Sequence, residues 1–280
     1  MDERYKMRTE QIKLTEQASL DLYVADQVGE LIRDAILVIP GGGYGWLCDY
    51  KEGQPIAQAF LAKGYNAFVL HYSLGEQAKF PQPLIEASLA VKHIKDHAEE
   101  YHINPDRVFA CGFSAGGHLC ASLGTLWHLP EVYKSANIPY GSNKVAGMLP
   151  IYPVITPFVP GTHMPSFHRI LGTEDPSLEE LKRYSPDLCV DEHTVPAFLM
   201  HTATDPVVAV ANTLTFARAL TDHHIPCEVH IFPEGPHGIA LANEITCFSE
   251  PEQIIPAASR WVDLANEWIK SVDTTTPRCK

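Results

Sequence analysis

Three side chains that follow short apolar runs could together perform nucleophilic chemistry: Ser114, Asp205 and His237. Ser114 lies in the pattern G-x-S-x-G, formed with Gly112 and Gly116, which is typical of a sharp strand-to-helix turn that exposes the serine hydroxyl. A serine hydroxyl is a weak nucleophile until a base takes its proton, and histidine is suited to that task near neutral pH. A carboxylate that orients the imidazole completes such a set. The pattern therefore predicts acyl transfer by these three residues.

Each member of this set has an alternative interpretation. The serine pattern also occurs in ordinary Gly/Ser turns. Asp205 could be a turn residue ahead of Pro206, and its nearest rival, Asp175, also precedes a proline but follows no predicted strand. The chain has 14 histidines, so position must select among them. His237 stands in a Gly/Pro-rich loop after a predicted strand, from which its side chain can reach across to the serine.

A glycine run ahead of this set suits the stabilisation of an oxyanion. Acyl transfer needs preorganised backbone N–H donors, and glycine lets the chain approach a substrate closely. We assign this role to the amides of Gly42 and Gly43, with that of Ala115 as the third donor. A dinucleotide-binding interpretation fails on spacing, because the third glycine that it needs is replaced by Trp46 or Cys48, depending on the starting glycine.

The elements that position these residues alternate between apolar runs and amphipathic segments. This alternation predicts an α/β fold with a mostly parallel sheet of about eight strands flanked by helices, in a single domain over 1–280. A turn is expected at 104–106, ahead of the strand that leads to Ser114. The proline-rich stretch from 153, with the segment to about 190, is predicted to be a small cap insertion over the active face. The predicted strands are two within 11–24 and one each at 35–39, 67–71, 108–111, 145–152, 197–201 and 227–232.

Composition limits the classes of partner. The formal net charge of −13 argues against nucleic acid and anionic membranes as partners. No stretch approaches the about 18–20 apolar residues of a membrane span, and the start of the chain carries no signal-like apolar region. A cytoplasmic protein is expected, with its seven scattered cysteines as reduced thiols. His93 and His97 lie four apart, but Ile94 stands where a zincin needs glutamate, so we expect a solvated helix face and no metal.

The motifs together resemble α/β-hydrolases of the esterase/lipase family, near the hormone-sensitive-lipase-like and the acetyl-xylan-esterase-like (xylanase-B-like) carboxylesterases. In hormone-sensitive-lipase relatives a histidine stands in place of Pro40, which points to the xylan-esterase-like branch. Many relatives carry arginine where this chain has Ser73. The similarity extends from about 35 to 268, and its motifs are Pro40-Gly41-Gly42-Gly43-Tyr44, His71-Tyr72-Ser73-Leu74, Phe80-Pro81, Asn104-Pro105-Asp106-Arg107-Val108, Gly112 to Leu119, Tyr184-Ser185-Pro186, Asp205-Pro206-Val207-Val208 and His237-Gly238.

The resemblance implies hydrolysis of small carboxylic esters without metal or organic cofactor. Tyr44, Trp46, Phe158 and Phe167 could wall an acyl or alcohol pocket, or equally belong to the core. Acetylated oligosaccharides or other short-chain esters are the expected substrates, and a homodimer is plausible. An arylformamidase or a peptidase would share the triad, and a non-catalytic hydrolase fold that binds a small ligand is the alternative of a different class.

Overall fold

The computed structural model describes residues 7–273, in which strands and helices alternate along most of the chain. Its strands are β1 (Arg8–Lys13), β2 (Ser19–Val24), β3 (Arg33–Ile39), β4 (Asn66–His71), β5 (Ile103–Phe113), β6 (Gly147–Ile151), β7 (Ala197–Thr202) and β8 (Cys227–Phe232). Its α-helices are α1 (Asp49–Glu52), α2 (Gln54–Ala62), α3 (Gln82–Asp96), α4 (Ser114–Leu126), α5 (Pro130–Tyr133), α6 (Met164–Leu171), α7 (Leu178–Arg183), α8 (Ala211–Asp222), α9 (Pro256–Ser259) and α10 (Trp261–Ser271). Short 3-10 helices are η1 (Gly75–Gln77), η2 (Pro186–Leu188) and η3 (Pro251–Gln253).

The eight strands form one sheet in the order β1-β2-β4-β3-β5-β6-β7-β8. β1 and β2 pair antiparallel at one edge, and β2 also runs antiparallel to β4. The other neighbouring strands are parallel. The predicted mostly parallel sheet of about eight strands is therefore confirmed. Since β5, β7 and β8 run in the same direction, their carboxyl ends lie along one edge of the sheet, where ligands bind in open α/β folds.

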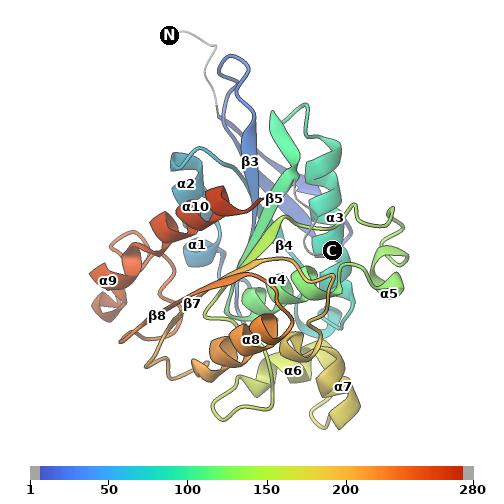
Figure 1. Cartoon of the computed structure of the whole chain (residues 1–280), viewed down its shortest axis with the longest axis vertical. Coiled ribbons are helices and arrows are strands. Elements are labelled where there is room, and N and C mark those ends of the chain that lie inside the picture. Colours follow the sequence, from blue (N-terminus) through green and yellow to red (C-terminus); the bar gives the residue numbers. More distant parts are fainter. Residues whose placement is uncertain (1–6, 274–280) are drawn as a thin grey trace.

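Both faces of the central part of the sheet are buried, which explains the continuous apolar runs of its central strands. In β3, Leu37 and Ile39 belong to one core cluster, whereas Ile36 and Val38 belong to the other. Figure 1 shows α3 and α4 on one side of the sheet and α2 and α10 on the other. Every side chain of such a strand is covered by a helix layer, so the alternation of polar and apolar residues seen in half-exposed strands is absent here.

One predicted turn is placed differently in the structure. β5 begins at Ile103 and continues through 104–106, which were expected to form a turn ahead of it. Its register with β3 shifts there, since Ile103 pairs with Arg33 whereas Val108 pairs with Ala35. The side chain of Asn104 still accepts the N–H of Asp106 at 2.9 Å. The turn chemistry thus produces an irregularity within the strand rather than its start.

The segment 153–190 leaves the sheet between β6 and β7 and contains α6, α7 and η2. Phe167 and Ile170 of α6 are buried in the core cluster that also includes α4, so this segment, which is the predicted cap insertion, is anchored to the body of the fold. α7 begins with a capping box in which Ser177 and Glu180 satisfy each other's backbone N–H groups. Among the described residues, no helix combines the length and apolar character that crossing a bilayer requires.

Candidate active site

Ser114 lies at the tip of a tight turn between β5 and α4, with a φ of 53° that non-glycine residues rarely adopt. The turn requires glycine on both sides of the serine. A Cβ at Gly112 would lie 2.1 Å from the carbonyl oxygen of Gly116, and a Cβ at Gly116 would lie 2.1 Å from that of Ile39. Neither distance is physically possible. The strained serine backbone is therefore held by close backbone contacts that larger residues would prevent.

Ser114, His237 and Asp205 form a continuous chain of hydrogen bonds. The Oγ of Ser114 lies 2.8 Å from Nε2 of His237, whose Nδ1 lies 2.6 Å from Oδ2 of Asp205. Asp205 follows β7, and His237 follows β8. In the tautomer that fits a carboxylate at Nδ1, Nδ1–H donates to Asp205 and Nε2 is free to accept the proton of the serine hydroxyl. The three predicted residues are thus brought together in the geometry of a nucleophile, its base and an orienting acid.

The Asp205 carboxylate is held by more than His237. Its Oδ1 accepts the backbone N–H groups of Val207 and Val208, both at 2.9 Å. The buried His201 approaches Oδ2 through Nε2 at 3.3 Å. Burial by itself raises the pKa of Asp205, but the hydrogen bonds from His201 and His237 outweigh it and hold this pKa well below its usual range. Asp205 is therefore ionised at neutral pH.

The glycine loop (41–43) lies directly against the serine turn. A Cβ at Gly41 would lie 3.0 Å from the Cβ of Ser114. Gly42 and Gly43 have φ values of 124° and 62°, and a Cβ at Gly42 would lie 2.1 Å from the carbonyl oxygen of Trp46. Ala115 follows Ser114 in the first turn of α4, where backbone N–H groups have no acceptor within the helix. The oxyanion role of these amides remains a prediction, which this placement supports.

A cavity of about 360 Å³ opens at Ser114 and His237. Gly42, Gly43 and Trp46 contribute to its lining, as predicted for the loop and for one of the four aromatic residues. The other three aromatic residues do not line it. Tyr44 and Phe167 are fully buried in the core, and Phe158 is 44% exposed in the insertion. For Tyr44 and Phe167, the core alternative is the correct one.

Tyr44 is buried because it connects the glycine loop to α4 and the insertion. Its hydroxyl donates to Nδ1 of His118 at 2.8 Å, and Nε2–H of His118 donates to the carbonyl oxygen of Tyr184 at 2.8 Å. The ring of Phe167 packs edge-on against the same imidazole, with 5.6 Å between ring centroids. Burial lowers the pKa of His118 to about 4, so this imidazole is neutral at neutral pH. Both ring nitrogens of His118 therefore take part in hydrogen bonds, one to Tyr44 and one to Tyr184.

A buried acid in the cavity lining, Glu52, did not emerge from the sequence. It is 3% exposed, accepts the N–H of Gly41 at 2.8 Å, and accepts the hydroxyl of Tyr152 at 2.9 Å. Burial raises the pKa of Glu52, while the Gly41 N–H and the nearby His237 act in the opposite direction. Two acids, Asp49 and Glu52, lie between the glycine run and the helix that starts at Gln54, and nothing in the sequence selects Glu52 of the two.

Two basic side chains of the insertion, His163 and Arg169, also line the cavity and were not predicted. A guanidinium nitrogen of Arg169 donates to the carbonyl oxygen of Gly43 at 2.8 Å. Burial lowers the pKa of His163, and the nearby His237 and Arg169 act in the same direction. The signal for both residues was their place in a segment predicted to cover the active face. Asp175, the rival acid, is exposed between α6 and α7, away from the cavity.

Comparison with known proteins agrees with this geometry. A family model described as BD-FAE matches residues 20–220. The chain is 40% identical over 219 residues to endo-1,4-beta-xylanase B of Butyrivibrio fibrisolvens, covering 76% of this chain and 33% of that protein. It is 30% identical over 243 residues to the acetylxylan esterase of Xylanibacter ruminicola, covering 85% of this chain and 45% of that protein. The chain thus spans between a third and a half of the length of these two curated relatives.

A solved structure matches over nearly the whole chain. The acetyl ester-xyloside bifunctional hydrolase from Caldicellulosiruptor lactoaceticus superposes with a TM-score of 0.82 at 30% identity, covering 95% of this chain and 97% of that one. The resemblance indicated by the sequence motifs is therefore confirmed. This chain has the α/β-hydrolase fold and belongs to the BD-FAE family.

Proposed function

We propose that this chain is a serine carboxylesterase that hydrolyses short-chain, acetyl-type esters through an acyl-enzyme intermediate. The observation that carries this proposal is the chain of hydrogen bonds from Ser114 Oγ through His237 to Asp205, at 2.8 and 2.6 Å. It lies beside a cavity whose volume suits a small ligand. The esterases among the relatives support the same reaction class.

In the first half of the reaction, Nε2 of His237 takes the hydroxyl proton of Ser114 while Oγ attacks the carbonyl carbon of the ester. The carbonyl oxygen becomes an oxyanion, which accepts hydrogen bonds from the amides of Gly42, Gly43 and Ala115. The carbon–oxygen bond to the alcohol then breaks, and His237 gives its proton to the departing alkoxide. The acyl group remains on Ser114.

In the second half, His237 takes a proton from a water molecule, which attacks the acyl carbon and forms a second oxyanion at the same amides. The bond to Oγ breaks, the carboxylic acid leaves and Ser114 regains its proton from His237. Asp205 stays ionised throughout and stabilises the imidazolium that forms in each half. Its low pKa makes it an electrostatic partner and not a proton acceptor.

The substrate that we propose is an acetylated saccharide, with the sugar at the mouth of the cavity. Trp46 and Tyr50 are both in the cavity lining and about half exposed, and their rings stack with 6.4 Å between centroids. Phe248, 59% exposed, packs edge-on against Tyr50. Exposed aromatic rings next to a cavity that also contains charged side chains suit a ligand with both apolar and hydroxyl-bearing faces. One relative is named an acetylxylan esterase, and an acetylated saccharide is the kind of substrate that this name describes. A cytoplasmic location and a homodimer remain predictions from the sequence.

The test compares hydrolysis of p-nitrophenyl acetate, butyrate and octanoate by the wild type and by Ser114→Ala. We expect turnover that decreases with chain length and disappears in the variant, followed by release of acetate from acetylated xylo-oligosaccharides. Turnover of N-formylkynurenine or of a peptide in place of the esters would move the assignment to an arylformamidase or a peptidase. Ligand binding with no serine-dependent turnover of any of these substrates would indicate the non-catalytic alternative.

A further inference from the structure

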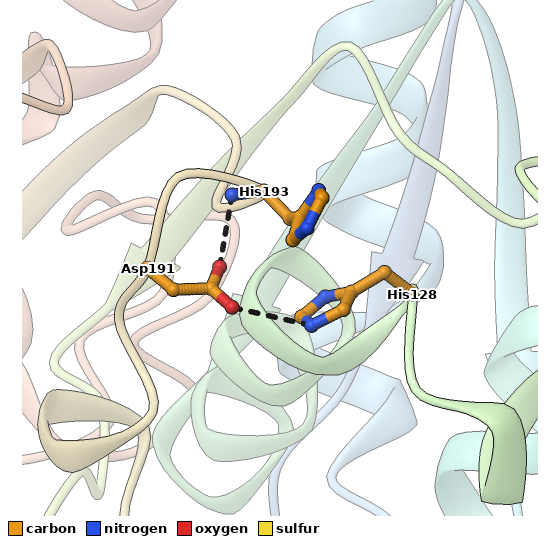
Figure 2. A group of neighbouring side chains, drawn as sticks. All are labelled: His128, Asp191 and His193. Carbon is orange, nitrogen blue, oxygen red and sulfur yellow. Dashed lines mark hydrogen bonds and ion pairs between the residues drawn. The ribbon is translucent and has the colours of Figure 1, made fainter.

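We propose that His128, Asp191 and His193 form a binding site for a divalent transition-metal ion, with Zn²⁺ as the best match. Figure 2 shows the three side chains converging from two segments that are distant in the sequence. His128 follows α4, while Asp191 and His193 lie in the loop that precedes β7. Among the described residues, they form the one group of three potential metal-ligating side chains whose ligand atoms all lie within 4.8 Å of one another.

The donor atoms select the class of metal. Two imidazole nitrogens and one carboxylate oxygen suit zinc, cobalt, nickel or copper, whereas magnesium and calcium prefer oxygen ligands alone. Zinc binds these donors at about 2.0–2.2 Å in tetrahedral sites, which places ligand atoms about 3.4 Å apart. Nε2 of His128 and Oδ2 of Asp191 already lie 3.2 Å apart. The partly exposed side chains need to close by about 1.4 Å at most to bring ligand atoms that lie within 4.8 Å of one another to tetrahedral separations.

The loop that carries two of the ligands is held in place by other contacts. Oδ1 of Asp191 accepts the backbone N–H of His193 at 2.9 Å, which leaves Oδ2 directed at His128. The indole N–H of Trp127 donates to the carbonyl oxygen of His193 at 2.9 Å, and the N–H of Val195 donates to that of Gly124 at 3.1 Å. Contacts of this kind orient metal ligands in advance and increase affinity.

The imidazole rings of His128 and His193 lie side by side, with 4.3 Å between centroids and 31° between planes, and the His128 ring contacts the carboxylate of Asp191. Nε2 of His128 and Oδ2 of Asp191 lie 3.2 Å apart, a distance that a ring N–H proton bridges as a hydrogen bond. A bound cation would take the place of that proton between the same two atoms. The exposed Glu192 between the two loop ligands adds further negative charge at the site.

The position of the site indicates a structural ion and not a catalytic one. α4 begins at Ser114 and has 13 residues, so its far end lies about 20 Å from the nucleophile. The ion would connect that end of the helix to the loop entering β7, whose other end leads to Asp205. The expected effect of the metal is therefore on stability, with esterase turnover unchanged.

The experiment uses the full chain with any histidine tag removed and with prior chelator treatment. Isothermal titration with ZnCl₂ should give one ion per chain, and Co²⁺ should produce the visible absorption of a bound ion. At a free Zn²⁺ concentration about 100-fold above the dissociation constant, the melting temperature should increase by on the order of 5 °C. His193→Gln and Asp191→Asn should each weaken Zn²⁺ binding by about 10- to 100-fold or more.

The matched control is His93→Gln. His93 and His97 form a second close histidine pair, on and just beyond α3, with 4.0 Å between ring centroids but with no carboxylate ligand in the group. Binding by the wild type that survives His93→Gln and is lost in both loop variants supports the proposal. Circular dichroism of the metal-free variants checks their folding. If Asp191→Asn does not fold, the Zn²⁺ affinity of His193→Gln alone tests the proposal.

Three results would overturn the proposal. The first is the absence of saturable Zn²⁺ binding by the wild type, which would leave a simple ion pair between His128 and Asp191. The second is binding that is unchanged in His193→Gln or that is lost in His93→Gln. The third is a preference for Mg²⁺ or Ca²⁺ over Zn²⁺.

Discussion

The carboxylate of Glu52 accepts the backbone N–H of Gly41 at 2.8 Å, so a buried acid holds the glycine loop beside the nucleophile. The same carboxylate interacts electrostatically with His237. It is therefore suited to act on both the oxyanion loop and the imidazolium. Neither role requires contact with the substrate, which makes Glu52 a positioning residue.

Replacing Glu52 with glutamine retains one of its two accepting oxygens, which can still accept the Gly41 N–H, and removes the charge. We expect kcat to decrease about 10-fold, because the imidazolium of His237 loses a neighbouring anion in the transition state. For the same reason, the acid limb of the kcat/KM profile should move to lower pH. The control is Glu250→Gln, which removes the charge of an acid that is 53% exposed and pairs with Lys51 at 3.4 Å. A lower rate with an unmoved acid limb would restrict Glu52 to holding the loop.

Asp205→Asn should reduce kcat by about 10³–10⁴-fold with little change in KM, because an amide no longer orients or stabilises the imidazolium. Stability should also change with pH. The pKa of Asp205 is held below its usual range in the folded state, so its ionised form contributes stability above about pH 4, and this contribution is lost on further acidification. Urea unfolding at pH 7 should thus find the variant less stable, and the difference should shrink below pH 4. A variant with wild-type turnover would remove Asp205 from the triad.

Gly42→Ala should decrease kcat by about 10²–10³-fold, the range seen when an oxyanion donor is lost. The new methyl group would meet the carbonyl oxygen of Trp46, so the loop must move away from Ser114. Gly64→Ala is a matched control, because Gly64 also has a positive φ of 95° but no atom within 4 Å of the added Cβ. The Gly64→Ala variant should have a free energy of unfolding lower by about 1 kcal/mol and an unchanged kcat. Equal losses of activity in both variants would attribute the effect to backbone strain alone.

Trp46→Ala should raise KM for acetylated xylo-oligosaccharides about 10-fold, which corresponds to the loss of one aromatic contact of about 1.4 kcal/mol. Hydrolysis of p-nitrophenyl acetate, which has no sugar to stack, should change little. Tyr140→Ala serves as the control, because Tyr140 is 58% exposed and packs on Trp127, outside the cavity lining. Equal losses on both substrates would argue against a saccharide at the cavity mouth.

The buried, neutral state of His118 should make the free energy of unfolding decrease at acidic pH. Its pKa is lowered by burial to about 4, whereas an unfolded chain binds the proton near pH 6.5. As the pH decreases below 6.5, the unfolded state gains a proton that the native state does not, and the free energy of unfolding falls by about 2 kcal/mol at pH 5. The destabilisation caused by His118→Gln should thus be smaller at pH 5 than at pH 7 in urea unfolding. The exposed His223→Gln should show no such difference. An equal effect of His118→Gln at both pH values would contradict the buried, neutral state.

The alternation of buried strands and amphipathic helices was predictable because both signals are local. The run 35–39 is apolar throughout, and the structure buries it on both faces within β3. The prediction of a turn at 104–106 ahead of β5 was wrong, because these residues lie within β5. A local turn signal does not reveal that the partner strand β3 continues alongside and absorbs the extra residues as a shift in register.

Local sequence signals were enough to predict the nucleophile turn, the glycine loop and the order of serine, acid and histidine after successive strands. These depend on short-range geometry, because glycines permit the turn and parallel strands end at one edge. The folded arrangement was needed to show that Tyr44 belongs to the core, that Glu52 holds the glycine loop, and that His163 and Arg169 line the cavity. The same is true of the meeting of His128 with the loop before β7. Such meetings depend on how distant loops pack over the sheet, which the periodicity of a single element does not encode.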